Sequence, residues 1–220
     1  MTKQVKTKER VSDFGEVFTN EREVNNMLDL VKEQTENIEA TFLEPACGDG
    51  NFLTEILKRK LSVVDSRYSK SPDNYEKFSI IAVTSIYGVE LLEDNAEECR
   101  NRLYSIWEKE YLRHCKKYAS EDCKNACKYI LHKNILCGDA LTMLRNNGHP
   151  IIFAEWKLVS GNLIKRRDYE LSKLLEVEQK QVDIFWILNG WEFDDETQRY
   201  IPAPIKEYPP IDYRKVMQYD

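Results

Sequence analysis

The sequence has no apolar run near the roughly 20 residues that a membrane-spanning helix needs. Its basic first ten residues have no apolar segment behind them, so we expect no secretory signal. Basic residues are not in excess, because 32 Lys and Arg stand against 38 Asp and Glu, for a net charge of -6. Phosphate neutralisation supplies most of a protein's affinity for duplex DNA. The composition therefore argues against a chain that binds DNA unaided, and leaves open a local basic patch or a partner.

Cysteine is present six times. In a chain without a secretory signal we expect reduced thiols and a cytoplasmic protein. Hydrophobic residues make up 42% and charged residues 32% of the 220 residues. These values indicate one soluble domain with its own core and a heavily charged surface.

Helical and extended patterns alternate along the chain. We expect helices over residues 20–37, 51–61, 93–118, 120–133 and 169–179, and strands over 40–46, 79–91, 134–137 and 151–156. This order predicts an α/β domain with a mostly parallel sheet and flanking helices. The polar stretch 65–77 is predicted to be a surface loop and Lys165-Arg166-Arg167 a basic turn. We divide the chain into a flexible arm, this domain and a C-terminal extension, at residues 1–12, 13–180 and 181–220.

A glycine turn between a strand and a helix is the most informative segment. The strand ending at Glu44 leads through Gly48 and Gly50 into a helix. In doubly wound sheets, ligands bind beyond the carboxyl ends of the strands, where a helix N-terminus offers free N–H groups. A Gly-x-Gly bend alone is equally typical of an ordinary turn.

A second acidic residue, Glu90, ends the next strong strand. A carboxylate there is placed to accept hydrogen bonds from the ribose hydroxyls of an adenosine-type cofactor. Its distance from the glycines exceeds the usual ~20 residues, and we interpret 65–77 as the insertion that explains the excess. The alternative is that Glu90 is a solvated carboxylate at a strand end.

Together, segments 42–52 and 87–91 resemble motifs I and II of S-adenosylmethionine-dependent methyltransferases, specifically the adenine-N6 DNA methylases of restriction–modification systems. Residues 13–20 resemble their motif X, with Asn20 in place of a proline, and residues 134–141 are similar to their Gly-Asp motif. The resemblance implies a Rossmann-like class I methyltransferase fold that binds S-adenosylmethionine. It also implies that Glu90 binds the ribose and Asp139 the adenine amino group. The cofactor-binding residues that it implies are Phe18, Thr19, Glu44, Pro45, Ala46, Cys47, Gly48, Asp49, Gly50, Phe52, Glu90, Leu91, Asp139 and Ala140.

The catalytic motif of the family is altered in this chain. Phe153-Ala154-Glu155-Trp156 stands where the family has Asn/Asp-Pro-Pro and an aromatic residue. In the family the first residue accepts hydrogen bonds from the target amine, and the ring stacks on the flipped base. Trp156 is our candidate for stacking and Glu155 for accepting a hydrogen bond. Because Phe153 has no lone pair to offer, the residues favour the alternative that Trp156 is core and Glu155 surface.

The cysteines and the basic run carry weaker hypotheses. Cys123 and Cys127 are one helical turn apart, but zinc sites usually pair cysteines at short loop spacings, so we predict no metal. Cys47 precedes a helix N-terminus, which can lower a thiol pKa. The resemblance implies instead that it forms part of the cofactor wall. The run at 165–167 could contact phosphate, although charge runs are usually solvated.

Two functions follow. The first is a methyltransferase that reaches DNA through a separate specificity or modification subunit, because the chain has no room for a further domain of ~100 residues. The second is a catalytically inactive cofactor-binding subunit with a regulatory or structural role. A methyltransferase for another substrate stays open, because a fold does not determine a function.

Overall fold

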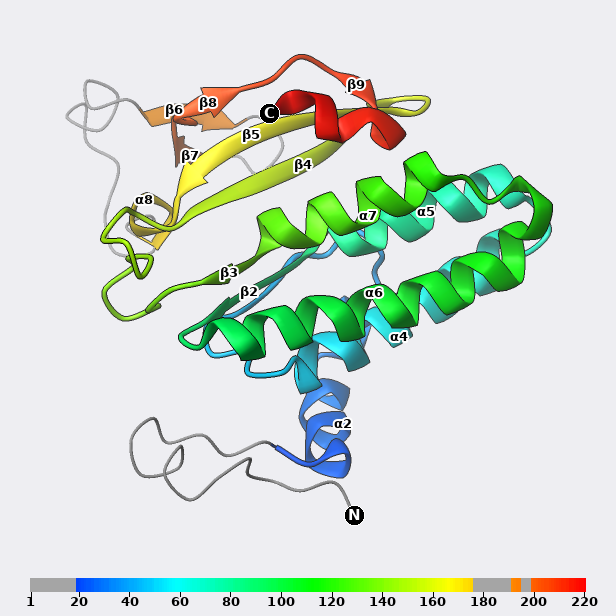
Figure 1. Cartoon of the computed structure of the whole chain (residues 1–220), viewed down its shortest axis with the longest axis horizontal. Coiled ribbons are helices and arrows are strands. Elements are labelled where there is room, and N and C mark those ends of the chain that lie inside the picture. The colour runs from blue at the N-terminus through cyan, green and yellow to red at the C-terminus, as the bar shows by residue number, and fades with distance from the viewer. Residues whose placement is uncertain (1–18, 176–190, 195–198) are drawn as a thin grey trace.

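The centre of the protein is a three-stranded parallel sheet in the order β1 (Phe42–Glu44), β2 (Ile86–Glu90) and β3 (Ile135–Cys137). Helices flank this sheet (Figure 1), so the predicted α/β class with a parallel sheet is confirmed and is compatible with a Rossmann-like fold. This computed structural model describes residues 19–175, 191–194 and 199–220.

The N-terminal helix begins next to residue 20, where the sequence predicts its start. In α2 (Glu21–Asp29) the Asn20 side chain accepts a hydrogen bond from the backbone N–H of Glu23, at 3.0 Å. The single helix predicted through residue 37 is wrong, because α2 ends at Asp29 and α3 (Lys32–Thr35) follows. The break falls at Val31, whose φ of -122° and ψ of 34° are not helical.

The segment between the first two strands corrects two predictions. Residues 65–77 are not a surface loop, because α4 (Asn51–Tyr68) continues into them and α5 (Pro72–Thr84) begins with its proline at the first turn. The first half of the strand predicted over 79–91 belongs to α5, and only 86–90 form β2. Residues 79–84 are buried on every side. A helix that is buried on all sides has no polar face, so its sequence shows the same continuous apolar run as a buried strand, and periodicity cannot distinguish the two.

The two long helices after β2 lie where periodicity predicts them. They are α6 (Glu93–Cys115), followed by the short η1 (Lys116–Tyr118), and α7 (Glu121–Asn134). The Ser120 hydroxyl caps α7 by accepting a hydrogen bond from the N–H of Cys123 at 3.2 Å. Both helices bury one apolar stripe, as an amphipathic helix must.

The apolar run after residue 150 does not join the parallel sheet. It forms β4 (Ile152–Ser160), which pairs in antiparallel fashion with β5 (Leu163–Glu170). The basic turn predicted at Lys165-Arg166-Arg167 is therefore wrong, because these residues lie inside β5. Burial alternates along both strands, with Ala154 and Trp156 buried on one face. This second sheet covers α5 and α7 (Figure 1).

The C-terminal residues complete the second sheet. β8 (Lys206–Glu207) and β9 (Ile211–Asp212) pair with β5, and a 3-10 helix, η3 (Tyr213–Tyr219), packs on α7. The Tyr213 hydroxyl donates a hydrogen bond to the buried Glu76 of α5 at 2.8 Å. In addition, β6 (Trp191–Asp194) pairs with β7 (Arg199–Pro202).

Of the helix predicted over residues 169–179, the structure describes α8 (Leu171–Leu175). Tyr169 belongs to β5 instead. Residues 176–179 lie outside the described residues.

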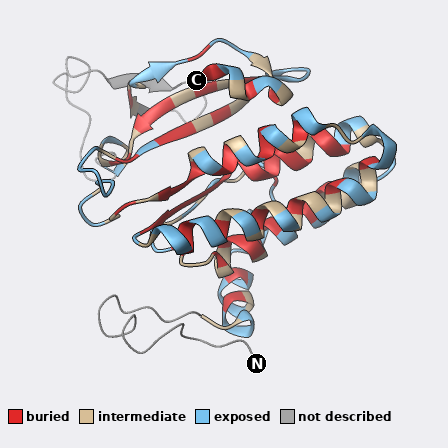
Figure 2. Cartoon of the chain, viewed as in Figure 1, coloured by how far each residue is buried: buried red, intermediate tan, exposed pale blue. Residues whose placement is uncertain are grey.

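The hydrophobic core lies on both faces of the parallel sheet (Figure 2). On one face β1 and β2 pack on α4, and on the other Tyr87 and Val89 pack on Phe153 of β4. The side chain of Lys60 is fully buried beside this core and donates to the carbonyls of Ile38 and Ala40 and to the Ser85 hydroxyl. Across the described ranges, no helix combines the length and the apolar character that crossing a bilayer would require.

Candidate functional site

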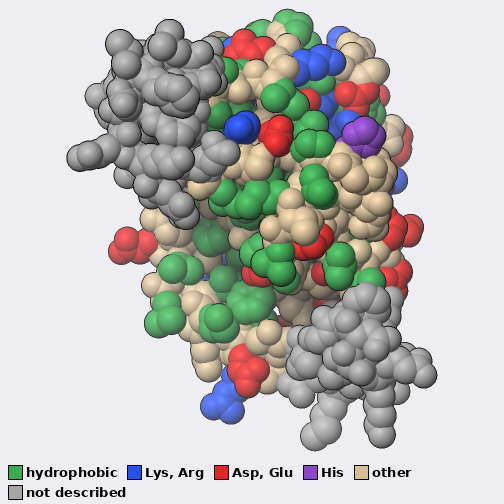
Figure 3. Space-filling model, turned by 90° about the vertical axis from the view of Figure 1, so that its left-hand side faces the viewer, with side chains coloured by type: hydrophobic (Ala, Val, Ile, Leu, Met, Phe, Trp, Pro, Cys, Tyr) green, Lys and Arg blue, Asp and Glu red, His purple; other side chains and the backbone are tan. Residues whose placement is uncertain are grey.

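A cavity of about 600 Å³ lies where the three parallel strands end. Hydrophobic side chains gather on this face of the molecule (Figure 3). The predicted residues that line the cavity are Thr19, Glu44, Pro45, Ala46, Cys47, Gly48, Phe52, Glu90, Leu91, Asp139 and Ala140. The fold therefore brings together residues from four segments that the sequence places up to 121 positions apart, from 19 to 140. Phe18 lies outside the described residues.

Two predicted residues shape the glycine turn instead of lining the cavity. Gly50 has a φ of +91°, and a Cβ atom there would lie 2.6 Å from Sγ of Cys99, so only glycine fits without a shift. A guanidinium nitrogen of Arg102 lies 2.8 Å from Oδ1 of Asp49, which holds this carboxylate on α6. Asp49 and Gly50 thus fix the course of the turn.

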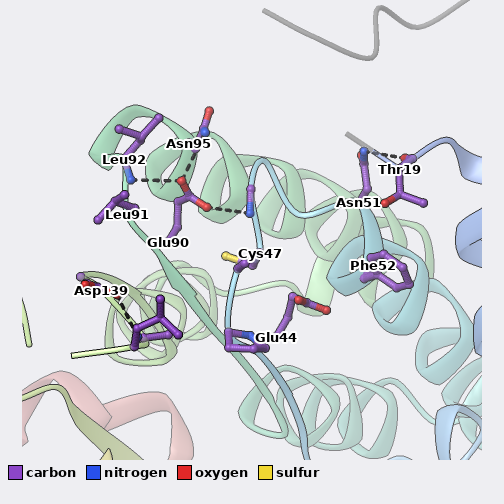
Figure 4. A pocket seen from close by; sticks show the side chains of 16 residues that line it. Thr19, Glu44, Cys47, Asn51, Phe52, Glu90, Leu91, Leu92, Asn95 and Asp139 are labelled. Atoms are coloured by element: carbon purple, nitrogen blue, oxygen red, sulfur yellow. Dashed lines mark hydrogen bonds between the residues drawn. The ribbon is translucent and has the colours of Figure 1, made fainter. Parts of the chain in front are cut away.

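Glu90 is buried and clamps this turn to the end of β2 (Figure 4). Its carboxylate accepts hydrogen bonds from the N–H of Gly48 at 2.8 Å and from the N–H of Leu92 at 3.0 Å. The Asn95 amide lies 3.4 Å away. With 8% of its surface exposed, Glu90 is not the solvated strand-end carboxylate of the alternative. A turn amide that binds an internal carboxylate is not available to a ligand phosphate.

Two more carboxylates face the cavity from the ends of β1 and β3. Burial raises the pKa of Glu44, and a hydrogen bond from the N–H of Ala46 partly opposes that shift. Asp139 lies two residues after the end of β3, and its carboxylate accepts a hydrogen bond from the N–H of Leu141 at 2.8 Å. Among the described residues that line the cavity there is no Lys, Arg or His. The cavity thus favours a ligand rich in hydrogen-bond donors or positive charge.

Cys47 forms part of the cavity wall as a protonated thiol. A hydrogen bond with Cys99 raises its pKa, and burial raises it further, so the helix N-terminus does not activate it. Gly88 of β2 makes room for this thiol, because a Cβ atom at position 88 would lie 2.8 Å from Sγ of Cys47. The residue fits a structural wall and not a nucleophile.

No family model, curated protein or solved structure matches the chain. The geometry of the cavity is therefore the basis for its function.

Sequence reasoning missed five residues of the wall, which are Asn51, Leu92, Asn95, Gly138 and Leu141. The Asn51 amide donates to the carbonyl of Thr19 at 3.1 Å and so ties the chain before α2 to the cavity. The available signal for Asn95 was its place in the first turn of the helix that follows Glu90. Leu141 had no such signal, because the turn after β3 positions it.

The two catalytic candidates lie away from this cavity. Trp156 is 8% exposed, and its indole N–H donates to Oδ1 of Asn134 at 2.9 Å. Its ring packs near Tyr129 and Tyr219, which corrects the base-stacking hypothesis: alternation along β4 directs this side chain into the core. Glu155 accepts a hydrogen bond from Arg167 at 2.6 Å and lines a separate, smaller cavity.

The basic run is engaged in ion pairs and does not form a phosphate-binding turn. Lys165 pairs with Glu207 at 3.1 Å, and Arg166 is buried against Asp168 at 2.7 Å. Arg167 is the partner of Glu155. All six cysteines are free thiols, and within residues 19–175, 191–194 and 199–220 no group of His, Cys, Asp or Glu is arranged to hold a metal ion.

Proposed function

We propose that the chain binds S-adenosylmethionine in the cavity at the strand ends. The observation that carries this proposal is the charge of the cavity, whose ionisable carboxylates are Glu44, Glu90 and Asp139, without a basic residue among its described lining. A phosphate-bearing cofactor would place its negative charge against these carboxylates. S-adenosylmethionine has one carboxylate, which its sulfonium and ammonium outweigh, and it also offers ribose hydroxyls and an adenine amino group as donors. The volume of about 600 Å³ lies within the range of small-molecule sites.

The residues divide between the parts of the cofactor as the resemblance implies. Glu90 would accept hydrogen bonds from the ribose, because a carboxylate has about four lone-pair sites and its two shortest bonds leave capacity. Asp139 would accept one from the adenine amino group. Thr19, in the segment that resembles motif X, would lie at the methionine end. We place Glu44, which lines the same cavity, beside it, where its carboxylate can balance positive charge.

The biological role that we propose is a class I methyltransferase subunit of the adenine-N6 DNA methylase type, acting in the cytoplasm. DNA would reach it through a separate specificity or modification subunit. This division of labour is supported by the net charge of -6 and by the engagement of Lys165, Arg166 and Arg167 in ion pairs. The bound cofactor supplies the methyl group, and this chain's residues orient it.

The second candidate is a cofactor-binding subunit without transfer chemistry. The burial of Trp156 and the pairing of Glu155 with Arg167 favour it, because neither side chain is available to a flipped base. Both candidates share the same cofactor site.

Calorimetry on the full chain tests the shared proposal. We expect S-adenosylmethionine and its demethylated product to bind and ATP and NAD⁺ to give no heat. If ATP binds as tightly, the charge argument fails. A filter assay with methyl-labelled cofactor and mixed-sequence DNA at low salt, with and without cell lysate, then separates the two candidates. Transfer only with lysate supports the methyltransferase subunit, and none in either case supports the inactive subunit.

A further inference from the structure

Another cavity, of about 410 Å³, lies beside the cofactor cavity and carries the opposite charge. Residues of α6, the last turn of α7, the end of β3 and the turn that follows β3 contribute to it. Cys137 lines this cavity and its neighbour Gly138 lines the other, so the two are adjacent. The polar side chains of its lining are those of Glu93, Arg100, His132, Arg145, Asn146 and Asn147.

Two guanidinium groups stand against one carboxylate in this lining. Arg100 lies two turns after Glu93 on α6, and its Nη2 pairs with that carboxylate at 2.7 Å. Arg145 is exposed and forms no hydrogen bond or ion pair through its side chain with the residues that the structure describes. Partial burial, with Arg100 nearby, lowers the pKa of His132, so its imidazole is neutral at pH 7. Two arginines and one glutamate therefore give the lining a formal charge of +1, in a chain whose net charge is -6.

Two donors of this lining lack an acceptor. The side chain of Arg100 is only 12% exposed, and its buried Nε has no hydrogen-bond partner among the described residues. Oδ1 of Asn147 accepts a hydrogen bond from the N–H of His149 at 3.1 Å, which leaves the two N–H groups of the Asn147 amide to donate. Buried donors without an acceptor are rare in proteins, and a bound ion is one way to supply the acceptor.

The turn after β3 holds its donors in place. The N–H of Arg145 donates to the carbonyl of His149, and the N–H of Gly148 donates to the carbonyl of Arg145, both at 2.8 Å. Gly148 has a φ of +79°, a conformation that glycine adopts without strain. The Asn146 amide donates to Sγ of Cys137 at 3.3 Å. Donors that are fixed before binding lose little freedom when a ligand arrives.

We propose that this cavity binds a phosphate group, which Arg100, Arg145 and Asn147 hold through its oxygens. The planar fork of a guanidinium group matches the oxygens of a phosphate. Because the donors come from α6 and from the turn after β3, an oxyanion whose oxygens point in several directions suits them better than a flat carboxylate. A phosphodiester carries a single negative charge, which the charge of +1 on the lining balances.

The DNA backbone is the source of phosphate that the proposed function implies, and this assignment rests on that function. A strand bound here would pass the cofactor cavity, which is adjacent. One phosphate contact fixes the position of a strand and leaves most of the affinity to a partner subunit. The cavity is then the local basic patch that the composition leaves open, in place of residues 165–167.

Titration of the full chain with inorganic phosphate, at constant ionic strength and without cofactor, is the first test. NMR follows the side-chain N–H signals of Arg145 and Asn147, which we expect to shift and to saturate. Exposed ion pairs contribute little, so we expect a dissociation constant in the millimolar range. Such binding gives no measurable heat at the micromolar concentrations of the cofactor calorimetry. Signals that do not shift, or arginine signals that shift alike over the whole surface, overturn the proposal.

A substitution at Asn147 separates a site from a general effect of charge. Asn147→Asp keeps the oxygen that accepts from His149 but replaces the donor with negative charge, and it should weaken phosphate binding at least about tenfold. The matched control is Asn37→Asp, because Oδ1 of Asn37 accepts the N–H of Glu39 in the same way, also at 3.1 Å, and does not line the cavity. Equal phosphate binding by the two variants contradicts the assignment of Asn147.

A second pair of variants tests the unpaired guanidinium. Arg145→Gln should weaken phosphate binding about two- to fivefold. Arg67→Gln removes the same charge from an exposed arginine in the last turn of α4 and should leave phosphate binding unchanged. If both variants weaken binding alike, the effect is that of net charge and the proposed site is refuted.

Competition identifies the source of the phosphate. A short single-stranded DNA should displace inorganic phosphate at the Asn147 signal, and it should do so less readily in Arg145→Gln. Displacement by AMP but not by DNA would refute the DNA backbone as the source and assign the site to a free nucleotide. Because no cofactor is present, a chain that binds phosphate here but not S-adenosylmethionine would overturn the proposed function and leave this site standing.

Discussion

Substitution of Glu90 by alanine is the sharpest perturbation of the proposed cofactor site. Hydrogen bonds to a charged group contribute about 1.5–3 kcal/mol. Loss of the ribose contact should therefore weaken S-adenosylmethionine roughly 10- to 160-fold. The same change removes the acceptor for the N–H groups of Gly48 and Leu92, 2.8 and 3.0 Å from the carboxylate.

The effect on the fold should be smaller than the effect on binding, because Gly48 and Leu92 are only partly buried and water can replace the lost acceptor. We expect an unfolding free energy lower by about 1–2 kcal/mol, which for a chain of this size is a melting shift of roughly 2–8 °C. Circular dichroism measures this shift and calorimetry the affinity, on the same sample.

Glu93→Ala is the matched control, because Glu93 is three residues away, pairs with Arg100 at 2.7 Å and does not line the cavity. It should leave the affinity for S-adenosylmethionine unchanged. Unchanged affinity in a folded Glu90→Ala protein would remove Glu90 from the site and refute the reasoning.

Three further predictions concern the second carboxylate and the core. Asp139→Ala should weaken S-adenosylmethionine in calorimetry more than it lowers the melting temperature; a large melting shift with normal binding would make Asp139 a structural cap of its turn. Trp156→Phe should lower the unfolding free energy by about 1–3 kcal/mol in urea titrations, because Oδ1 of Asn134 loses its donor. It should leave the affinity for S-adenosylmethionine unchanged. A loss of affinity would place Trp156 in the cofactor site. Burial lowers the pKa of Lys60 from 10.5 to about 7. Between those two values the unfolded chain binds a proton that the folded chain does not, so stability should rise with pH across this window. Lys60→Met should lose that rise, and an identical pH slope in the variant and the parent would contradict the shift.

Local signals account for the parts of the fold that the sequence predicts correctly. Asn20 with Glu23 and Ser120 with Cys123 are capping pairs only three positions apart, so their hydrogen bonds are encoded within one turn. The turn at Gly48 and Gly50 is local in the same way. These elements were predictable because few residues decide them.

The errors arise where tertiary packing decides. Residues 79–84 have the composition of a strand, but they are enclosed by neighbouring helices and form part of α5. The side chains of β4 and β5 alternate as strands should, yet only their pairing shows that Trp156 faces the core. Burial on all sides and strand pairing are properties of the whole fold, which periodicity in one segment does not report.

The site was predictable to the extent that its residues lie at the carboxyl ends of strands. Glu44 and Glu90 are the last residues of β1 and β2, Asp139 comes two residues after β3, and all three line the cavity. Asn51 and Leu141 are placed by a side-chain hydrogen bond and a turn, respectively, which depend on contacts absent from any short motif.

The bond between Glu76 and Tyr213 has a consequence for synthesis on the ribosome. Its two ends are 137 residues apart, and η3 packs on α7 only once that bond can form. At ~5–20 residues per second, translation of this interval takes roughly 7–27 seconds. During that time a carboxylate inside α5 lacks one of its donors, and once α7 has been synthesised its apolar surface beneath η3 is open to solvent. We expect the nascent chain to be a substrate for chaperones after its parallel sheet has been synthesised and before η3 packs on α7.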